Sequence, residues 1–513
     1  MSRRRKTLIA LGIMLGVAIL VPVIRHYQLR AATEAYIAQL KAQGEPMELP
    51  QVIPPPVPPD QNGADTFRRA AALIDADTHL GYTNYAYGMG MIAAGKAMVR
   101  WWQPDIRDSD GTNSWESVEA AVDQNTQSFA LLQQIIARPD FDFHIKYEKG
   151  VTDLDFTNLY LPESKRAAQW LETAAICGLR RGDTASAVEN LHAMLALSKA
   201  LRDERLVISE LVRIAIANIA LTVNWEVLQS TNVTDGQLAE LQNDWMGLDF
   251  VRGEENALEM ERLMGCMNAD KWRNCGLELQ HFLEPDVSAP GFFDQGATAL
   301  RRVNIATKVL LWRYWWSYPD ELQMLKGYQL SLAATHSAET NGSFLKPIED
   351  QKKELEILRI GAFGSGWEVM FGQDMDMHRM LSASVTPLSF VLNRVMMAET
   401  TKQVVVAATA LKRYQLKHGT YPPDLNSLVP EFLPKVPLDP VDGCPLRYRR
   451  NADGTFLLYS VGENGQDDGG NPALEKNFKS SIYYWQIPHA LDWVWPQPAS
   501  PAEIQNYYAH PPK

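Results

Sequence analysis

"SKRAAQWLETAAICGLRRGDTASAVENLHAMLALSKA" (164–200) decides the fold class of this chain. Apolar residues recur at every third or fourth position on both sides of the Arg-Gly-Asp turn at 181–183, which is the spacing of one face of a helix. Gly182 suits the position just after a helix, and Asp183 suits the N-cap of the next one. The stretch therefore predicts a helical hairpin.

The helical pattern extends far beyond this hairpin. Residues 206–228 carry an apolar stripe, and Thr234 with Gln237 has the spacing of a capping box before another helix. No second copy aligns at the period of about 34 residues that tetratricopeptide repeats keep. We therefore predict a mainly α protein with an irregular α-helical domain at 63–345. Its many aromatic residues either pack in the core or line a binding groove.

The N-terminus has the features of a membrane anchor at 1–30. Four basic residues, 3–6, precede the uncharged residues 7–24, which at about 1.5 Å per residue just cross roughly 30 Å of hydrocarbon. Arg25 and His26 follow directly, where a cleaved signal peptide would carry a small-residue cleavage site. The basic residues before the span predict a single pass of the inner membrane, with the N-terminus cytoplasmic and the body periplasmic.

Composition limits the partners and the chemistry. The formal net charge is -12, and basic residues cluster only at the N-terminus, which argues against a nucleic-acid partner. The four cysteines are too few for a disulfide framework and lack paired spacing for zinc. Cys266 and Cys275 either bridge in an oxidising periplasm or stay as two buried thiols.

A second unit, 388–486, is predicted from a change of pattern near the C-terminus. An apolar periodicity over 388–418 predicts a long helix, which a glycine and two prolines then end. Residues 446–450 and 455–461 read as a hairpin, and 481–485 can add a third strand. The expected result is an α+β unit with a long helix on a three-stranded antiparallel sheet.

Three further segments connect or flank these units. They are a polar stalk with a proline-rich linker at 31–62, a connector at 346–387 and a proline-rich tail at 487–513. The linker has six prolines between positions 50 and 60, so we expect it to be stiff and extended and to hold the body off the membrane.

Three motifs of the C-terminal unit occur in an order and spacing that resemble a known family. They are "YQLKHGTYPPDLNSL" (414–428), "PLDPVDGCPLRY" (437–448) and "YSVGENGQDDGG" (459–470). The unit resembles the C-terminal half of the major pseudopilin of type II secretion systems. The resemblance implies a helix-plus-sheet fold and a calcium-stabilised loop. It does not imply pseudopilus assembly, because Pro387 and the polar residues 372–378 stand where a pseudopilin has its processing site and apolar helix. The helical body is similar to long membrane-anchored proteins of planctomycete-type bacteria, and that similarity implies no activity.

The resemblance directs attention to the loop after the second strand. In the pseudopilin pattern the side-chain ligands are an aspartate in a Gly-x-Asp-Gly turn and a second aspartate just before the final strand. Here Asn464 takes the first place, and we expect serines, Ser480 and Ser481, at the second. Asp467 and Asp468 are the carboxylates best placed to compensate. Calcium affinity follows ligand charge, so the loop either keeps the family's shape with weak or no calcium binding or forms a real site through these residues.

Two other motifs give weaker evidence for a functional site. "GMGMIA" (88–93) matches a relaxed dinucleotide-binding fingerprint without the required strand before it, so small residues in close packing explain it better. "DMDMH" (374–378) offers two carboxylates and an imidazole for a metal, or is a solvated connector.

The sequence as a whole leaves two functional classes. One is a membrane-anchored, periplasm-facing scaffold or adaptor for envelope proteins, linked to the cell envelope or to type II secretion. The other is a hydrolase whose site is assembled from distant residues of the helical domain.

Overall fold

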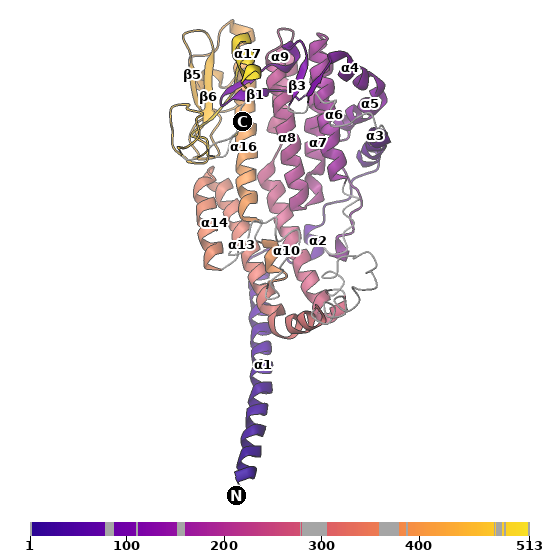
Figure 1. Cartoon of the computed structure of the whole chain (residues 1–513), viewed down its shortest axis with the longest axis vertical. Helices are drawn as coiled ribbons and strands as arrows, with labels where there is room; N and C mark the ends of the chain where they lie inside the picture. Colours follow the sequence, from indigo (N-terminus) through magenta and orange to yellow (C-terminus); the bar gives the residue numbers. More distant parts are fainter. Residues whose placement is uncertain are drawn as a thin grey trace.

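Helices α6 (Leu161–Arg180) and α7 (Thr184–Ala200) form the hairpin predicted at 164–200 (Figure 1). Gly182 has a φ of +79°, a conformation that favours glycine, and the Asp183 carboxylate accepts from the Ser186 N–H at 3.0 Å as an N-cap. The computed structural model describes residues 3–76, 87–108, 111–150, 160–277, 279, 305–358, 379–385, 388–476, 478, 485–486 and 489–510. It is mainly helical with a small sheet region near the C-terminus, so the predicted fold class is confirmed at that level.

The hairpin belongs to a bundle with α8 (Val207–Leu228), α9 (Asp235–Met246) and α10 (Phe250–Asn274). The capping box of Thr234 and Gln237 begins α9 as predicted. Three tryptophans are fully buried in the shared core of this bundle: Trp170, Trp225 and Trp245. In this part of the molecule the aromatic residues therefore serve as core.

Smaller elements surround the bundle, and some of them are strands that the helical pattern at 63–345 did not predict. The helices and helical turns are α3 (Ala64–Ala76), η2 (Arg100–Trp102), α4 (Trp115–Gln124), α5 (Thr126–Gln134), η3 (Ile135–Ala137), η4 (Tyr147–Lys149) and η7 (Leu201–Glu204). The strands are β1 (Gly90–Ala93), β2 (Lys96–Met98), β3 (Ile106–Asp108) and β4 (Gly111–Asn113). The strands pair antiparallel as β1 with β2 and β3 with β4, and β2 also pairs in parallel with β8 (Gln497–Pro498).

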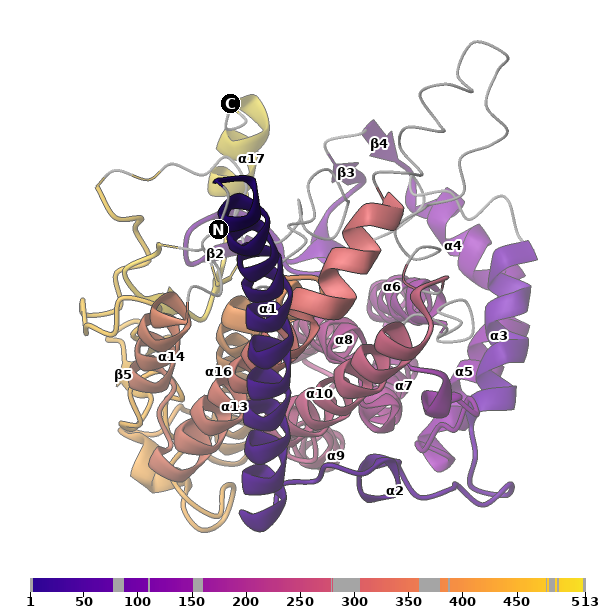
Figure 2. The ribbon, with the colours of Figure 1, turned by 90° about the horizontal axis from the view of Figure 1, so that it is seen from below.

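The N-terminal residues form one continuous 40-residue helix, α1 (Arg3–Ala42), about 60 Å long. Its C-terminal part packs on the body, whereas its N-terminal part projects away from it (Figures 1 and 2). The linker lies along the body: α2 (Leu49–Val52) contacts α10, and Val52 is fully buried. The expectation of a stiff, extended linker is therefore wrong for residues 49–52, which are helical and packed on the body.

The lower body is completed by the π-helical turn η8 (Trp312–Trp316), α13 (Ser317–Asn341), α14 (Leu345–Ile357) and η9 (Ser382–Val385). Cys266 is buried in α10 and Cys275 is exposed just after it, and both are free thiols. Nine helical residues separate them by about 13 Å, beyond the reach of about 7 Å for a disulfide.

The C-terminal unit contains α16 (Leu388–His418), η10 (Leu425–Leu428), β5 (Arg447–Arg450), β6 (Phe456–Ser460), β7 (Trp493–Val494) and α17 (Pro501–Ala509). The sheet order is β5-β6-β7 and both pairings are antiparallel. The strand predicted at 481–485 lies almost entirely outside the described residues. The third strand, β7, comes instead from the segment predicted as a proline-rich tail.

Helix α16 packs against α8, α9 and α10 as well as against β6. Trp225 of α8 donates its indole N–H to the carbonyl of Pro496 at 2.9 Å, which fixes the C-terminal segment to the bundle. The helical body and the C-terminal unit therefore share one hydrophobic core across the boundary predicted at residue 388.

Candidate functional site

The loop predicted as a calcium site follows β6 and is closed by its own side chains. Asn464 accepts from the Gln466 N–H at 2.9 Å and donates its Nδ2 to Asp468 Oδ2 at 2.9 Å. Asp467 Oδ1 accepts from the Tyr459 hydroxyl at 2.8 Å. The structure brings the three predicted ligands into one loop, and each of them has a protein partner there.

A further carboxylate, that of Asp492, accepts hydrogen bonds from the backbone of this loop. Its Oδ2 accepts from the N–H groups of Gly470 at 2.9 Å and Asn471 at 2.8 Å, and its Oδ1 accepts from that of Asp468 at 3.4 Å. The side chain is only 1% exposed. Burial raises the pKa of Asp492, while the three N–H groups lower it. These bonds explain how the glycine-rich loop keeps one shape.

Asp492 stands directly before β7, the place of the second aspartate in the pseudopilin pattern. Ser480 and Ser481, which were expected there, lie outside the described residues. The aspartate before the closing "WVW" (493–495) was the signal that could have found it. Asp492 lies beyond the third strand expected at 481–485, so the sequence prediction does not reach it.

A fixed cation, Arg447, lies between two carboxylates of the segment before β5 and one carboxylate of the loop. Arg447 of β5 donates Nη1 to Asp439 and Asp442, both at 3.1 Å, and its Nε lies 3.5 Å from Asp467 Oδ2. Calcium binds about six to eight oxygens, whereas these oxygens accept from N–H, hydroxyl and guanidinium groups. Within the described residues no group of three or more acidic, His or Cys side chains is placed to hold a metal. This donor arrangement does not fit a calcium ion.

The motif at 374–378 lies outside the described residues, and that at 88–93 leads into β1. Gly88 approaches α8 closely, because a Cβ there would be 3.2 Å from the backbone of Thr222. Buried carboxylates hold this segment: Glu172 accepts from the Gly88 N–H at 2.9 Å, and Glu226 accepts from the Met89 N–H at 2.7 Å. The motif is thus a backbone segment seated on two helices.

Four glutamates buried in the bundle were not singled out from the sequence. Burial raises the pKa of Glu172 and Glu261 to about 7 and that of Glu204 and Glu226 to about 8. Glutamates within otherwise apolar helix faces were the available signal. Their bonds to neighbouring backbone and hydroxyl groups indicate a structural role.

The lower end of the body exposes a group of apolar side chains beside α1. Leu310, Tyr314 and Trp315 are each more than half exposed, and Leu311 is 37% exposed. His26 Nδ1 of α1 lies 2.8 Å from the Tyr314 carbonyl oxygen, so this segment contacts α1 directly. We call Leu310, Leu311, Tyr314 and Trp315 the basal patch.

Helix α1 itself exposes apolar side chains in the same region. Ile13, Met14, Leu20, Val21, Val23 and Ile24 are all exposed. Val21 lines a cavity of about 450 Å³ together with Trp315 of the basal patch, so the end of the apolar stretch and the patch are at one level along α1. Where side chains are described, one helix passes a length and hydropathy test for a membrane span, Val207–Leu228, and 61% of its apolar window is buried in the bundle.

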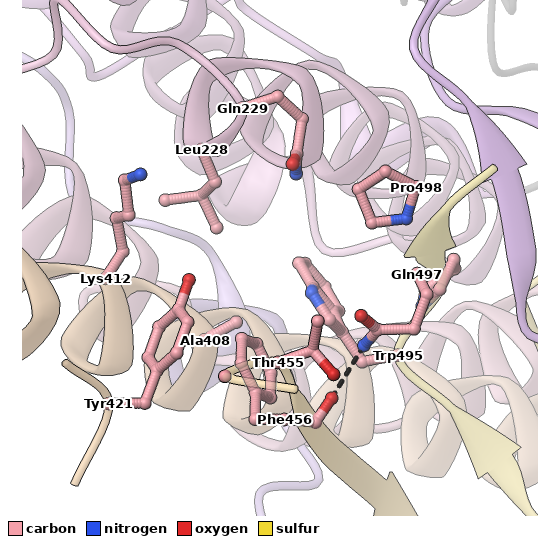
Figure 3. Close-up of a pocket in the computed structure, with 12 residues that line it drawn as sticks. Leu228, Gln229, Ala408, Lys412, Tyr421, Thr455, Phe456, Trp495, Gln497 and Pro498 are labelled. Atoms are coloured by element: carbon pink, nitrogen blue, oxygen red, sulfur yellow. Dashed lines mark hydrogen bonds between the residues drawn. The ribbon is translucent and has the colours of Figure 1, made fainter. Parts of the chain in front are cut away.

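A smaller cavity of about 170 Å³ lies where α8, α16 and the C-terminal segment meet. Figure 3 shows the amine of Lys412 and the hydroxyl of Tyr421 at its edge, with Leu228, Phe456 and Trp495 around it. Burial lowers the pKa of Lys412 and raises that of Tyr421. These residues come from distant parts of the chain, so no local sequence pattern indicates the cavity.

No family model, curated protein or solved structure matches this chain significantly. Function must therefore be argued from the sequence and the geometry.

Proposed function

We propose that this chain is a membrane-anchored scaffold or adaptor that binds envelope proteins, with residues 7–24 in the inner membrane and the body in the periplasm. The observation that carries the proposal is the shared level of the basal patch and the end of the apolar stretch of α1. Exposed apolar groups so close together are typical of a membrane or protein contact.

The depth of the patch agrees with the length of the anchor. If residues 7–24 span the hydrocarbon, Ile24 lies at its edge, and the cavity that Val21 and Trp315 line lies at the same depth. Tryptophan and tyrosine are enriched at that interface because their rings combine apolar and polar parts. Trp315 and Tyr314 would then rest among the lipid headgroups.

The junction between anchor and body supports a scaffold that holds a fixed position. Thr33 and Leu40 of α1 are each 1% exposed, and the Thr33 hydroxyl donates to the Tyr318 carbonyl at 3.1 Å. The body is thereby attached to α1 along several turns. A rigid attachment would present the same face of the body to partners at a constant height above the membrane.

The proposal requires neither calcium nor nucleic acid. Asp492 and Arg447 supply the loop at 462–471 with the contacts that a cation would otherwise provide, so the loop binds calcium weakly or not at all. The net charge of -12 would repel a phosphate backbone.

One pair of side chains in the structure is compatible with the hydrolase alternative. His192 Nδ1 lies 2.5 Å from Asp244 Oδ2, a pair of the kind that orients a general base. A hydrolase also needs a nucleophile and a substrate cavity beside that pair, and the cavities described above are elsewhere. The scaffold is therefore the better supported function.

Depth measurements in proteoliposomes test the proposal. In full-length protein with Cys275→Ser and Cys444→Ser, an environment-sensitive fluorophore is attached to Trp315→Cys or to Leu416→Cys. Leu416 is exposed near the end of α16, away from α1 (Figure 1). Nitroxide lipids should quench the label at 315 and not that at 416. Equal quenching at both sites contradicts the proposed orientation.

A further inference from the structure

We propose that the cavity beside Lys412 binds a small aromatic monocarboxylate, with its carboxylate between the Lys412 ammonium and the Tyr421 hydroxyl. The proposal does not depend on the membrane function. It rests on the charge, the polar groups and the size of the cavity.

Lys412 differs from the neighbouring cations of α16. Arg413 is paired with Asp235 at 2.8 Å, and Lys417 is paired with Glu431. For Lys412 the described part of the chain offers no ion-pair partner. A partly buried ammonium without a counter-charge is unfavourable, so a bound anion would stabilise it.

The lining of the cavity supplies no competing anion. Its twelve residues include no aspartate and no glutamate, and Lys412 is their one charged member. In Figure 3 the polar ends of Lys412 and Tyr421 face the same space. A tyrosine whose pKa is raised by burial keeps its proton at neutral pH and can donate it in a hydrogen bond. The two groups together fit one carboxylate.

The remaining walls fit an aromatic ring. Leu228, Phe456 and Trp495 are buried apolar residues around the cavity. Gln497 is held in place, because its Nε2 donates to the Phe456 carbonyl at 2.7 Å (Figure 3). The volume of about 170 Å³ suits one ring, since a cavity of roughly 150 Å³ in another protein holds benzene. Aromatic walls also favour offset or edge contacts with such a ring.

Isothermal titration of the full chain in detergent tests the proposal with benzoate, phenylacetate and cyclohexanecarboxylate as probes. At least one acid should bind saturably, with a dissociation constant below about 10 mM. Lys412→Met should weaken that binding by about tenfold to a hundredfold, and Tyr421→Phe by about fivefold, as expected for lost hydrogen bonds to a charged group. Because the anion favours the ammonium form, binding should take up protons at any pH at which Lys412 of the free protein is partly deprotonated.

Two controls separate the site from general charge effects. Lys417→Met removes the same charge from the same helix outside the cavity, and it should leave the affinity within about twofold. Benzyl alcohol, which has the ring without the carboxylate, should bind at least about tenfold more weakly than benzoate. No saturable binding by any of the three acids overturns the proposal, as does binding that Lys412→Met leaves unchanged in a protein with wild-type circular dichroism.

Discussion

Arg262 Nη1 lies 2.8 Å from Glu45 Oε2, and this pair joins the segment just after α1 to the middle of α10. Arg262 is fully buried, and its guanidinium also donates to Gln329 Oε1 at 2.6 Å and to the Pro46 carbonyl at 3.2 Å. Gln329 in turn donates to Glu45 Oε1 at 2.7 Å. This charged network is one of the contacts that attach the α1 segment to the body.

Glu45→Ala should destabilise the protein by about 1 to 3 kcal/mol, because it leaves the buried Arg262 without its carboxylate. The exposed Glu48, paired with Lys41, offers a matched control, and Glu48→Ala should cost less than about 1 kcal/mol. Urea unfolding of the full chain in detergent measures both. Adding Arg262→Met to Glu45→Ala should recover part of the loss. Equal losses for Glu45→Ala and Glu48→Ala would show that the network does not hold the junction.

Stability should fall as pH rises from about 5 to about 8.5. Burial raises the pKa values of Glu204 and Glu226 to about 8, whereas the ordinary value for a glutamate is 4.5. Between these values the folded state binds more protons than the unfolded state, so the free energy of unfolding decreases with pH. Urea midpoints across this range measure the effect.

Glu204→Gln should make that pH dependence shallower, because an amide replaces one carboxyl that must lose its proton. Each displaced pKa unit corresponds to about 1.4 kcal/mol. Glu189→Gln, on the exposed side of α7, should leave the slope unchanged. A wild-type stability that rises steadily from pH 5 to 8.5 contradicts the assignment of these buried carboxyls.

Asp492→Ala should destabilise the C-terminal unit by about 2 kcal/mol, since three backbone N–H groups lose their buried acceptor. Asp468→Ala removes a more exposed carboxylate of the same loop and should cost less. Calcium should not change the urea midpoint of the wild type at about 1 mM, a concentration at which only a site of micromolar affinity would shift it strongly. A calcium-dependent shift that Asp467→Ala abolishes would establish the loop as a working site.

Local signals account for what could be predicted from the sequence. The hairpin at 164–200, the capping box before α9 and the end of α16 at His418 depend on residues within one or two turns of each other. Caps and apolar periodicity act over that distance, so they can be read without the tertiary structure.

Contacts between distant segments account for what could not be predicted. Strand β2 pairs with β8, joining Lys96 to Gln497, and Trp225 holds Pro496. No local pattern shows that a proline-rich tail enters a sheet and a core. The loop carboxylates show the same difference. Asp467 and Asp468 lie within the loop and can be identified from the sequence. Asp492 reaches the loop from the segment before the third strand, so no local pattern identifies it.

The basal patch should contribute to membrane association beyond the anchor. Leu311→Ser with Trp315→Ser should reduce quenching of a fluorophore at Tyr314→Cys by nitroxide lipids, because the segment loses two apolar groups that favour the interface. Leu277→Ser, at another exposed apolar residue, is the matched control. Unchanged quenching in the double variant would separate the patch from the membrane.

A reporter fused after Lys513 tests whether this is an anchored protein with its body in the periplasm. Alkaline phosphatase folds to an active form only after export, where its disulfides can form. We expect high phosphatase activity in intact cells. Reversal of the charge bias, with residues 3–6 neutralised and basic residues added after residue 25, should lower that activity. An inactive phosphatase fusion together with a fluorescent cytoplasmic reporter at the same position would contradict the proposed topology.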